Sequence, residues 1–383
     1  MKSRRRTICV VSGKRGGFNA LLPTMLAIAK DPAFRLQTVL TDMHLSGLFG
    51  RTIRDARRWI KIDAAVDIRQ AGASALERTE ALGRGLAGLA RAFARLKPDM
   101  VVVLGDRSET LTAAFAALQL KIPIAHIQGG EISGNIDGIQ RHAITKLAHL
   151  HFAETKQAAE RILKMGEEAW RVHAVGAPYI DFIRKKLYTP ASEVRKKFGL
   201  SKQEPFVLVL HHPVTTEPEL SYQNMSQVLA AVKATGLRAI VIYPCSDQGY
   251  QGIIDAIEEK RGDPQFSIYK NIPAEDFIGL EAITTALVGN SSAGIYEAPY
   301  VYCPFVNVGS RQEGRERERN VIDVPPERAA IGAAIRRVRT AAFQNRLRRL
   351  EFIYGDGRAY QRIVRVLKSV RLDAKLFKKR MTL

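Results

Sequence analysis

Short apolar runs rich in β-branched residues alternate along this chain with longer segments of helical periodicity. Strands of this near-continuously apolar kind, separated by helices, are typical of parallel sheets that are covered on both faces. The runs that predict strands are 7–13, 36–42, 64–69, 100–106, 123–128, 150–155 and 171–176 in the first half, and 206–211, 238–243, 266–271, 285–290 and 304–309 in the second.

These predicted strands are too many for one open sheet, which usually has about 4–6 strands and rarely more than about 10. We therefore predict an α/β protein built from two doubly wound, Rossmann-like domains. The boundary is expected after the stretch VGAPYIDFIRKKLYTP, where two helical segments flank a proline. This gives an N-terminal domain over 1–187 and a C-terminal domain over 188–355, followed by helical residues 356–383 with no strand after them.

The composition is that of a soluble globular protein, with 46% hydrophobic and 25% charged residues. No apolar run approaches the roughly 20 residues that a membrane span needs, so we expect no transmembrane segment. The apolar segment after the basic N-terminus is too short for a secretion signal and lacks a small-residue cleavage site. Cys9, Cys245 and Cys303 are widely spaced, without a CxxC pair, which argues against a disulfide framework or zinc site and favours the cytoplasm.

A formal net charge of +21 makes polyanions candidate partners. The basic residues are nevertheless spread along the chain, and the denser stretches have mostly helical spacing, which is typical of solvated helix faces. No nucleic-acid-binding motif accompanies them, so we expect no specific nucleic-acid partner. The denser stretches are 4–6, 51–61, 335–349 and 375–380.

Polar clusters gather at the ends of the predicted strands. In open α/β sheets, ligands bind beyond the carboxyl ends of the strands, so these ends are where a site is expected. They cover residues 12–17, 41–44, 105–109, 126–131, 211–217, 243–247, 289–294 and 309–315.

The stretch GNSSAGIYEAP predicts an anion site at the start of a helix. The hydroxyls of Ser291 and Ser292, together with free backbone amides, suit a diphosphate, although either serine could simply be an N-cap. Glu297, further along the predicted helix, could accept both hydroxyls of a ribose. Arg311 and Arg315 follow the next strand and present donors that match phosphate.

The first domain offers a second set of strand-end residues. Arg15 lies in a glycine-rich turn, but neither a GxGxxG fingerprint nor a P-loop is present, so nicotinamide, flavin and ATP have no support as cofactors. Asp106 and Arg107 follow a buried strand, where Asp106 could be catalytic or could cap the next helix. His212 follows a strand of the second domain and could act as acid or base, while one of His211 and His212 is expected to pack.

The stretch HIQGGEISGNIDGIQRH combines a strand end, a glycine turn and a helix rich in ionisable groups. Asp137 and Gln140 have the spacing of a capping box, which is a structural alternative to catalysis for Asp137. Glu131 has no such alternative. His126, Glu131 and His142 lack a recognised metal-ligand spacing, so no metal is expected. His149 and His151 are expected to be structural.

These motifs, GDRSETL, HIQGGEISGNIDGIQRHAITKLAHLHF, HHPVTTE and GNSSAGIYEAP…VNVGSRQEGR, resemble those of the hydrolysing UDP-N-acetylglucosamine 2-epimerases, from about Thr7 to Val324. The resemblance implies the GT-B architecture, in which two Rossmann-like domains face each other across a cleft that holds the ligand and the C-terminal helix returns to the first domain. It also implies a homo-oligomer, a dimer or tetramer.

The resemblance implies a reaction without metal or cofactor. UDP leaves carbon 1 of UDP-N-acetylglucosamine as a proton leaves carbon 2, and water adds to the resulting glycal to give N-acetylmannosamine, as in sialic acid biosynthesis. By position, the catalytic residues would be Asp106, Gln128, Glu131, Asp137 and His212. The substrate-binding residues would be Arg15, Arg107, Arg141, His142, Ser246, Ser291, Ser292, Gly294, Glu297, Arg311 and Arg315.

Three positions depart from the pattern of the family. Gln128 stands where many relatives carry a catalytic Glu, Cys245 where Asn is usual, and Gly17 where an acidic residue is common. An amide cannot act as a base, so either Glu131 takes more of the proton transfer or the substrate is UDP-2,4-diacetamido-2,4,6-trideoxyglucose. A GT-B glycosyltransferase and a non-catalytic UDP-sugar-binding protein are the alternatives from other functional classes.

Overall fold

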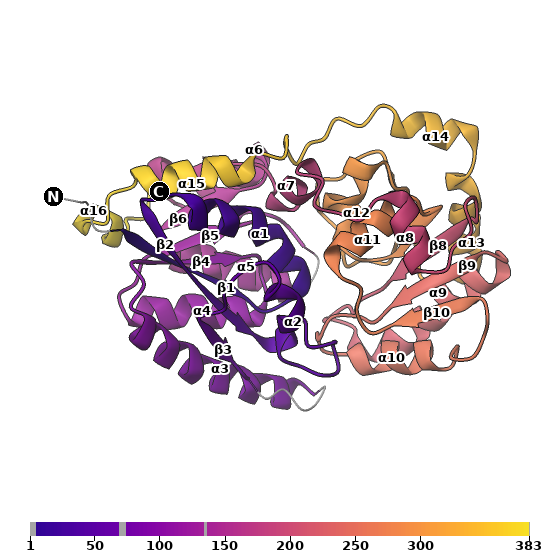
Figure 1. Ribbon diagram of the computed structural model, residues 1–383, viewed down its shortest axis with the longest axis horizontal. Helices are drawn as coiled ribbons and strands as arrows, with labels where there is room; N and C mark the ends of the chain where they lie inside the picture. The colour runs from indigo at the N-terminus through magenta and orange to yellow at the C-terminus, as the bar shows by residue number, and fades with distance from the viewer. Residues whose placement is uncertain (1–4, 69–73, 134–135, 383) are drawn as a thin grey trace. The chain divides into compact units, whose positions relative to one another are not determined.

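Two parallel sheets organise the chain in the computed structural model, which describes residues 5–68, 74–133 and 136–382 (Figure 1). Unit 1 comprises Met1–Ile132, Ile136–Lys185 and Tyr354–Leu383, and unit 2 comprises Ser133–Asn135 and Lys186–Ile353. The prediction of two doubly wound α/β sheets is confirmed. Within the described ranges, no helix is long and apolar enough to cross a membrane.

The sheet of unit 1 has the order β3-β2-β1-β4-β5-β6-β7, and its described strands pair in parallel. Its strands are β1 (Arg6–Ser12), β2 (Phe34–Thr41), β3 (Ala64–Val66), β4 (Met100–Leu104), β5 (Ile124–Ile127), β6 (Leu150–Ala153) and β7 (Val172–Ala174). The strand order reverses between β1 and β4, so the ends of these two strands form the switch point at which such sheets bind ligands.

Helices cover both faces of this sheet. One face carries α3, α4 and α5, which pack in that order, and the other carries α1, α7 and α15. In Figure 1 helix α15, in yellow, lies beside α1, in indigo. The helices are α1 (Arg15–Lys30), α2 (Ile53–Ala56), α3 (Ala75–Leu96), α4 (Ser108–Gln119), α5 (Ile136–Leu147), α6 (Lys156–Lys164), α7 (Pro178–Arg184), α15 (Ala359–Ser369) and α16 (Ala374–Phe377), with 3-10 turns η1 (Asp42–His44) and η2 (Ala169–Arg171).

The core beneath α3, α4 and α5 follows from the apolar strand sequences. Val101 and Val103 of β4 are fully buried against it, and the small residues Ala113 and Ala117 let α4 approach the sheet closely. Phe93 closes this core from α3.

The sheet of unit 2, whose residues 186–353 are all described, has the order β10-β9-β8-β11-β12-β13. Its strands are β8 (Phe206–Leu210), β9 (Arg238–Ile242), β10 (Phe266–Tyr269), β11 (Ala286–Gly289), β12 (Phe305–Val308) and β13 (Val321–Val324). Its helices are α8 (Ala191–Lys197), α9 (Ser221–Ala234), α10 (Tyr250–Glu258), α11 (Ala274–Glu281), α12 (Ala293–Tyr296), α13 (Arg328–Val338) and α14 (Ala341–Leu347), with 3-10 turns η3 (Pro218–Leu220) and η4 (Ala298–Val301). The switch point lies between β8 and β11.

One strand of unit 2 was missed. We predicted no strand after residue 309, yet Val321–Val324 pairs with β12 as the edge strand β13. Only Val321 of this segment is buried, and Asp323 is exposed, so the sequence lacks the continuous apolar run that identifies the other strands.

The C-terminal segment is fixed to unit 1 by a buried carboxylate. Asp181 of α7 accepts hydrogen bonds from the first two amides of α15, those of Ala359 at 2.9 Å and Tyr360 at 2.6 Å. Burial raises the pKa of Asp181 to about 7, against the opposing effect of these two amides. Its side chain is fully buried.

This pKa makes the stability of the protein pH-dependent. Because the folded-state pKa is raised, the protonated form contributes stability that is complete below about pH 4 and is lost as the pH rises through about 7. We expect the free energy of unfolding of the wild type to fall by about 2 kcal/mol more than that of Asp181→Asn between pH 5 and 7.5. Urea denaturation across this range measures it, and parallel pH profiles for the two proteins would contradict the assignment.

Candidate active site

The switch point of unit 1 brings together the ends of β1 and β4, which are neighbours in the sheet. Gly13 follows β1, and a Cβ atom there would overlap the side chain of Glu109 at the start of α4. The sequence therefore needs glycine at position 13 so that this carboxylate can lie against the first turn. Arg15, the first residue of α1, lies beside this turn in the chain, but its side chain is outside what the structure describes.

A network of two buried acids, the buried Arg107 and the partly buried Arg78 lies at the carboxyl ends of these strands. Arg78 donates to both carboxylate oxygens of Asp42, each at 3.2 Å, and to Glu109 at 3.1 Å. Arg107 donates to Glu109 at 2.8 Å. Burial acts to raise the pKa of Glu109, but Arg107 and Arg78 outweigh it and hold this pKa below its ordinary value. Arg107, a predicted substrate-binding residue, is thus a buried partner of Glu109 in this structure.

Asp106 and Arg141 form a buried ion pair that joins the end of β4 to helix α5. Arg141 also donates to the backbone carbonyl of Glu131 at 2.9 Å, which holds the glycine turn against the helix. The alternative in which Asp106 caps α4 is wrong, because Arg107 is the cap residue of that helix and makes no side-chain cap bond. Asp106, Glu131 and Arg141, which were predicted separately, are therefore in one cluster.

Gln128 occupies a strained position at the end of β5. Its φ of 72° lies in the left-handed region, which residues other than glycine rarely adopt. Its backbone amide donates to the carbonyl of Phe152 at 3.0 Å, and its side-chain amide donates to Glu154 at 3.1 Å. Glu154 is buried and was missed by sequence analysis, although its place at the end of β6 could have drawn attention to it.

The remaining predicted residues of unit 1 lie on α5. Asp137 is buried in the first turn of the helix, and the capping-box alternative stays a prediction because residue 135, next to the helix, lies outside the described residues. His142 is half-buried, and burial, with Arg141 and Arg161 nearby, lowers its pKa. His142 is therefore neutral near neutral pH.

At the switch point of unit 2, one asparagine connects the ends of β8 and β11 by hydrogen bonds. Asn290, at the end of β11, accepts a hydrogen bond from the amide of His212 at 2.7 Å and donates to the carbonyl of the same residue at 2.9 Å. The close approach of β8 and β11 requires Gly289, whose φ is 139° and where a Cβ would overlap the carbonyl of Leu210. Asn290 was not among the predicted residues, although it lies within the GNSS motif.

His212 has a defined tautomer when neutral. Its Nδ1 accepts a hydrogen bond from the backbone amide of Cys245 at 3.0 Å, so the proton of the neutral ring is on Nε2. The thiol of Cys245 donates to Asp247 at 2.8 Å. His211 is buried, and burial lowers its pKa to about 3, which confirms that one histidine of the pair packs.

The tandem serines precede a single helical turn rather than the longer helix we expected, because α12 has only 4 residues. Ser291 accepts a hydrogen bond from the amide of Ala293 at 3.3 Å, while Ser292, the cap residue, makes no side-chain cap bond. Gly294 is buried against the ring of Phe305. The prediction that Glu297 lies within this helix is wrong, since it follows α12 as its C-cap residue.

Arg311 lies beside the residue that precedes the tandem serines. It donates to the carbonyl of Asn290 at 3.3 Å and lies 3.7 Å from a carboxylate oxygen of Asp247. Gln312 donates to the same carbonyl at 2.7 Å. The backbone amide of Arg315 donates to the carbonyl of Gln312 at 3.4 Å, and its guanidinium stacks over the ring of Tyr296, 5.4 Å from the ring centroid.

Two further residues complete the description of unit 2. Ser246, a predicted binding residue, is buried. Glu281, which sequence analysis missed, is fully buried at the end of α11, and burial together with the charge of Glu297 raises its pKa well above the ordinary value. Glu281 therefore holds its proton more tightly than an ordinary carboxyl group, and no local sequence signal identifies it.

Two doubly wound units, each with buried polar networks at its switch point, define an α/β protein of the class that binds ligands at the carboxyl ends of its strands. The family model described as UDP-N-acetylglucosamine 2-epimerase matches residues 26–368. The chain belongs to this family, as the sequence motifs predicted.

Named relatives cover nearly the whole chain. A Legionella pneumophila protein, UDP-N,N'-diacetylbacillosamine 2-epimerase (hydrolyzing), is 33% identical over 375 residues, which are 98% of each chain. A UDP-N-acetylglucosamine 2-epimerase of Neisseria meningitidis is 33% identical over 332 residues, which are 86% of each chain. The two relatives carry different substrate names at equal identity.

Solved structures agree on the fold. A Neisseria meningitidis UDP-GlcNAc 2-epimerase bound to UDP-GlcNAc has a TM-score of 0.79 at 20% identity, covering 94% of this chain and 99% of that one. A Methanocaldococcus jannaschii UDP-GlcNAc 2-epimerase in complex with UDP-GlcNAc and UDP has a TM-score of 0.78 at 19% identity, covering 95% and 100%. The fold is thus that of the GT-B-like epimerases.

The buried ion pair gives a direct test of this site. Removing the cation with Arg141→Met leaves the Asp106 carboxylate buried without its partner, which we expect to lower the free energy of unfolding by about 3–5 kcal/mol. The double variant Asp106→Asn/Arg141→Met should recover part of this loss, because no charge then remains. Urea denaturation of the three proteins measures it, and a double variant less stable than Arg141→Met would refute the pairing.

Proposed function

We propose that this protein is a hydrolysing UDP-N-acetylglucosamine 2-epimerase, which converts UDP-N-acetylglucosamine and water to N-acetylmannosamine and UDP. The observation that carries the proposal is the buried Asp106–Arg141 pair, because it keeps a carboxylate in a protected site on a chain of this family. The Neisseria meningitidis relative named for the same activity, at 33% identity, supports it.

The reaction needs a base, a stabilised leaving group and a proton donor. A base takes the proton from carbon 2 while the bond between carbon 1 and the diphosphate oxygen breaks, and its electrons leave with UDP. The glycal that remains takes a proton on the other face of carbon 2, and the oxygen of water adds to carbon 1. No metal or cofactor enters this balance.

The proton transfers are assigned to the first unit. Asp106, Asp137 and Glu131 are its candidate bases and acids, and all three are buried around α5 and the glycine turn. The amide of Gln128 cannot take a proton. Its hydrogen bond to Glu154 supports a role in holding the end of β5 in place, which leaves Glu131 to take more of the proton transfer.

The UDP contacts are assigned to the second unit. The hydroxyls of Ser291 and Ser292 and the guanidinium of Arg311 suit a diphosphate, and Glu297 suits the two ribose hydroxyls. His212 carries its proton on Nε2 when neutral, so it can donate a hydrogen bond or a proton to the departing diphosphate.

A second substrate is favoured by one observation. The Legionella pneumophila relative, which matches 98% of each chain, is named for UDP-N,N'-diacetylbacillosamine. This sugar differs from N-acetylglucosamine at carbon 4, where an acetamido group replaces the hydroxyl, and at carbon 6, where hydrogen replaces the hydroxyl. The chemistry at carbons 1 and 2 is the same, so the same acids would serve either substrate.

Product analysis separates the two substrates. The protein is incubated with UDP-N-acetylglucosamine and, in parallel, with UDP-N,N'-diacetylbacillosamine, and the sugars are identified by NMR. We expect UDP and the free 2-epimeric sugar from at least one substrate, with the deuterium of heavy water incorporated at carbon 2. Intact nucleotide sugar in both reactions would refute the proposal, and dependence on an added acceptor would indicate a glycosyltransferase instead.

Replacing Asp106 tests the assignment of the proton transfers. Asp106→Asn keeps the size of the side chain but removes its charge, so we expect kcat to fall by about 100-fold or more. The Kd for UDP, measured by calorimetry, should stay within about twofold, because the UDP contacts are assigned to other residues. A variant that keeps wild-type kcat would show that Asp106 does not take part in the chemistry.

A further inference from the structure

The C-terminal tail, residues 374–382, is fixed to unit 1 by a buried arginine. Arg171 of η2 is fully buried and donates to the backbone carbonyls of Leu376 at 2.8 Å, Lys375 at 2.9 Å and Lys378 at 3.3 Å. The basic run 375–380 was predicted to be a solvated helix face. That prediction is wrong for Lys379, whose side chain is only 18% exposed.

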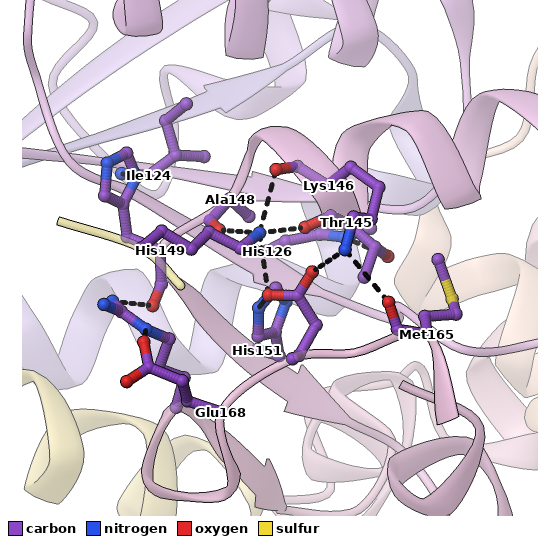
Figure 2. Close-up of polar contacts among 12 residues, drawn as sticks. Ile124, His126, Thr145, Lys146, Ala148, His149, His151, Met165 and Glu168 are labelled. Atoms are coloured by element: carbon purple, nitrogen blue, oxygen red, sulfur yellow. Dashed lines mark hydrogen bonds and ion pairs between the residues drawn. The ribbon is translucent and has the colours of Figure 1, made fainter. Parts of the chain in front are cut away.

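Lys379 binds the end of helix α5. Its ammonium group donates to the backbone carbonyls of Thr145 at 3.0 Å, Lys146 at 2.8 Å and Ala148 at 2.8 Å. Figure 2 shows these three labelled residues with their carbonyl oxygens converging on one nitrogen. The last carbonyls of a helix have no partner within it and carry the negative end of its dipole, so a cation there is favourable.

Glu167 fixes the position of this lysine from the opposite side. One of its carboxylate oxygens lies 2.7 Å from the Lys379 ammonium and 3.1 Å from Nε2 of His151, and the other accepts from Lys146 at 2.8 Å. Glu167 is buried, and although burial acts to raise its pKa, hydrogen bonds from His151, Lys146 and Lys379 bring that pKa down to about 2. Glu167 therefore stays ionised across the physiological range.

The same turn of α5 leads to the acids of the candidate site. The hydroxyl of Thr145 donates to the carbonyl of Arg141 at 3.0 Å and lies 3.4 Å from Nδ1 of His126. His126 contacts the carbonyl of Gly105 at 2.7 Å, directly before Asp106. Lys379 thus binds Thr145. Two connections link Thr145 to the Asp106–Arg141 pair, one along helix α5 and one through the hydrogen bonds of His126.

We propose that Lys379 is a positioning residue for the reaction, which it supports by anchoring the carboxyl end of α5 so that Arg141 keeps its place beside Asp106. The inference rests on the proposed function for its kinetic part only. A helix of this length moves largely as one body, so a change at its carboxyl end is transmitted along the helix to Asp137 and Arg141. The tail makes no assigned substrate contact, so the effect should be on kcat rather than on KM.

The charge of Lys379 sets a pH limit on this anchor. Burial lowers the pKa of Lys379 to about 8, against the opposing effect of Glu167, and Lys146 and Arg171 lower it further. The charged and titratable groups that interact with it are Glu167, Lys146 of α5, Arg171 of η2, His126 of β5, His149, and His151 of β6. Below this pKa the ammonium has three N–H donors, while the neutral amine above it has two and lacks the charge–charge attraction to Glu167.

The test compares Lys379→Met with Lys379→Arg and with Lys378→Met as a matched control. Lys378 lies next to Lys379 in the tail, and its side chain is exposed. Lys378→Met removes the same charge as Lys379→Met, so it is a matched control. With a UDP-sugar that the wild type turns over, we expect Lys379→Met to lower kcat about tenfold with KM within about twofold. Lys379→Arg should recover most of the loss, and Lys378→Met should behave as the wild type.

A pH profile provides a readout that a merely structural role would not move. Arginine stays protonated, so the ratio of wild-type kcat to Lys379→Arg kcat should be constant below about pH 8 and fall above it. Thermal unfolding shows whether Lys379→Met folds. If it does not, the pH dependence of the wild-type to Lys379→Arg kcat ratio still tests the proposal. A constant ratio up to pH 9.5 would count against the proposal.

Hydrogen–deuterium exchange gives an outcome independent of turnover. Peptides covering residues 136–149 should exchange faster in Lys379→Met than in the wild type, and at the wild-type rate in Lys378→Met. Unchanged exchange together with unchanged kcat overturns the inference. If the wild type turns over no UDP-sugar, the proposed function fails, and the exchange data alone then show whether Lys379 anchors α5.

Discussion

The Asp106–Arg141 ion pair is the interaction on which the site of unit 1 depends. Charges with exposures of 8% and 0% can share the interior only because each neutralises the other. The pair ties the end of β4 to α5, and a further donation from Arg141 fixes the turn that carries Glu131. One guanidinium therefore sets the relative positions of residues from a strand, a turn and a helix.

In unit 2 the side-chain amide of Asn290, rather than an ion pair, connects the ends of neighbouring strands. The strands β8 and β11 end side by side, and beyond Leu210 and Gly289 the backbone has no ladder partner. Asn290 supplies one acceptor and one donor to the backbone of His212, and Cys245 then orients the ring. The proton position on a candidate acid is thus decided by a chain of neutral hydrogen bonds, which costs no charge burial.

The tail shows how a local polar contact can act on a site at a distance. Lys379 has a run of basic neighbours, yet its ammonium lies among three carbonyls and one carboxylate. Its neighbour Lys378 is exposed. Lys378 and Lys379 contribute equally to the net charge of +21. Of the two side chains, that of Lys379 binds α5.

The sequence by itself determined the two sheets, because buried parallel strands require apolar β-branched runs that are visible locally. It also placed Asp106, His212 and the tandem serines at strand ends. It missed β13, an edge strand with one buried residue, and partners such as Arg78, Glu154 and Asn290. Only the tertiary structure decided which charges pair, because pairing depends on the distance between residues far apart in the chain, as with Lys379 and Thr145, and no local pattern reports that distance.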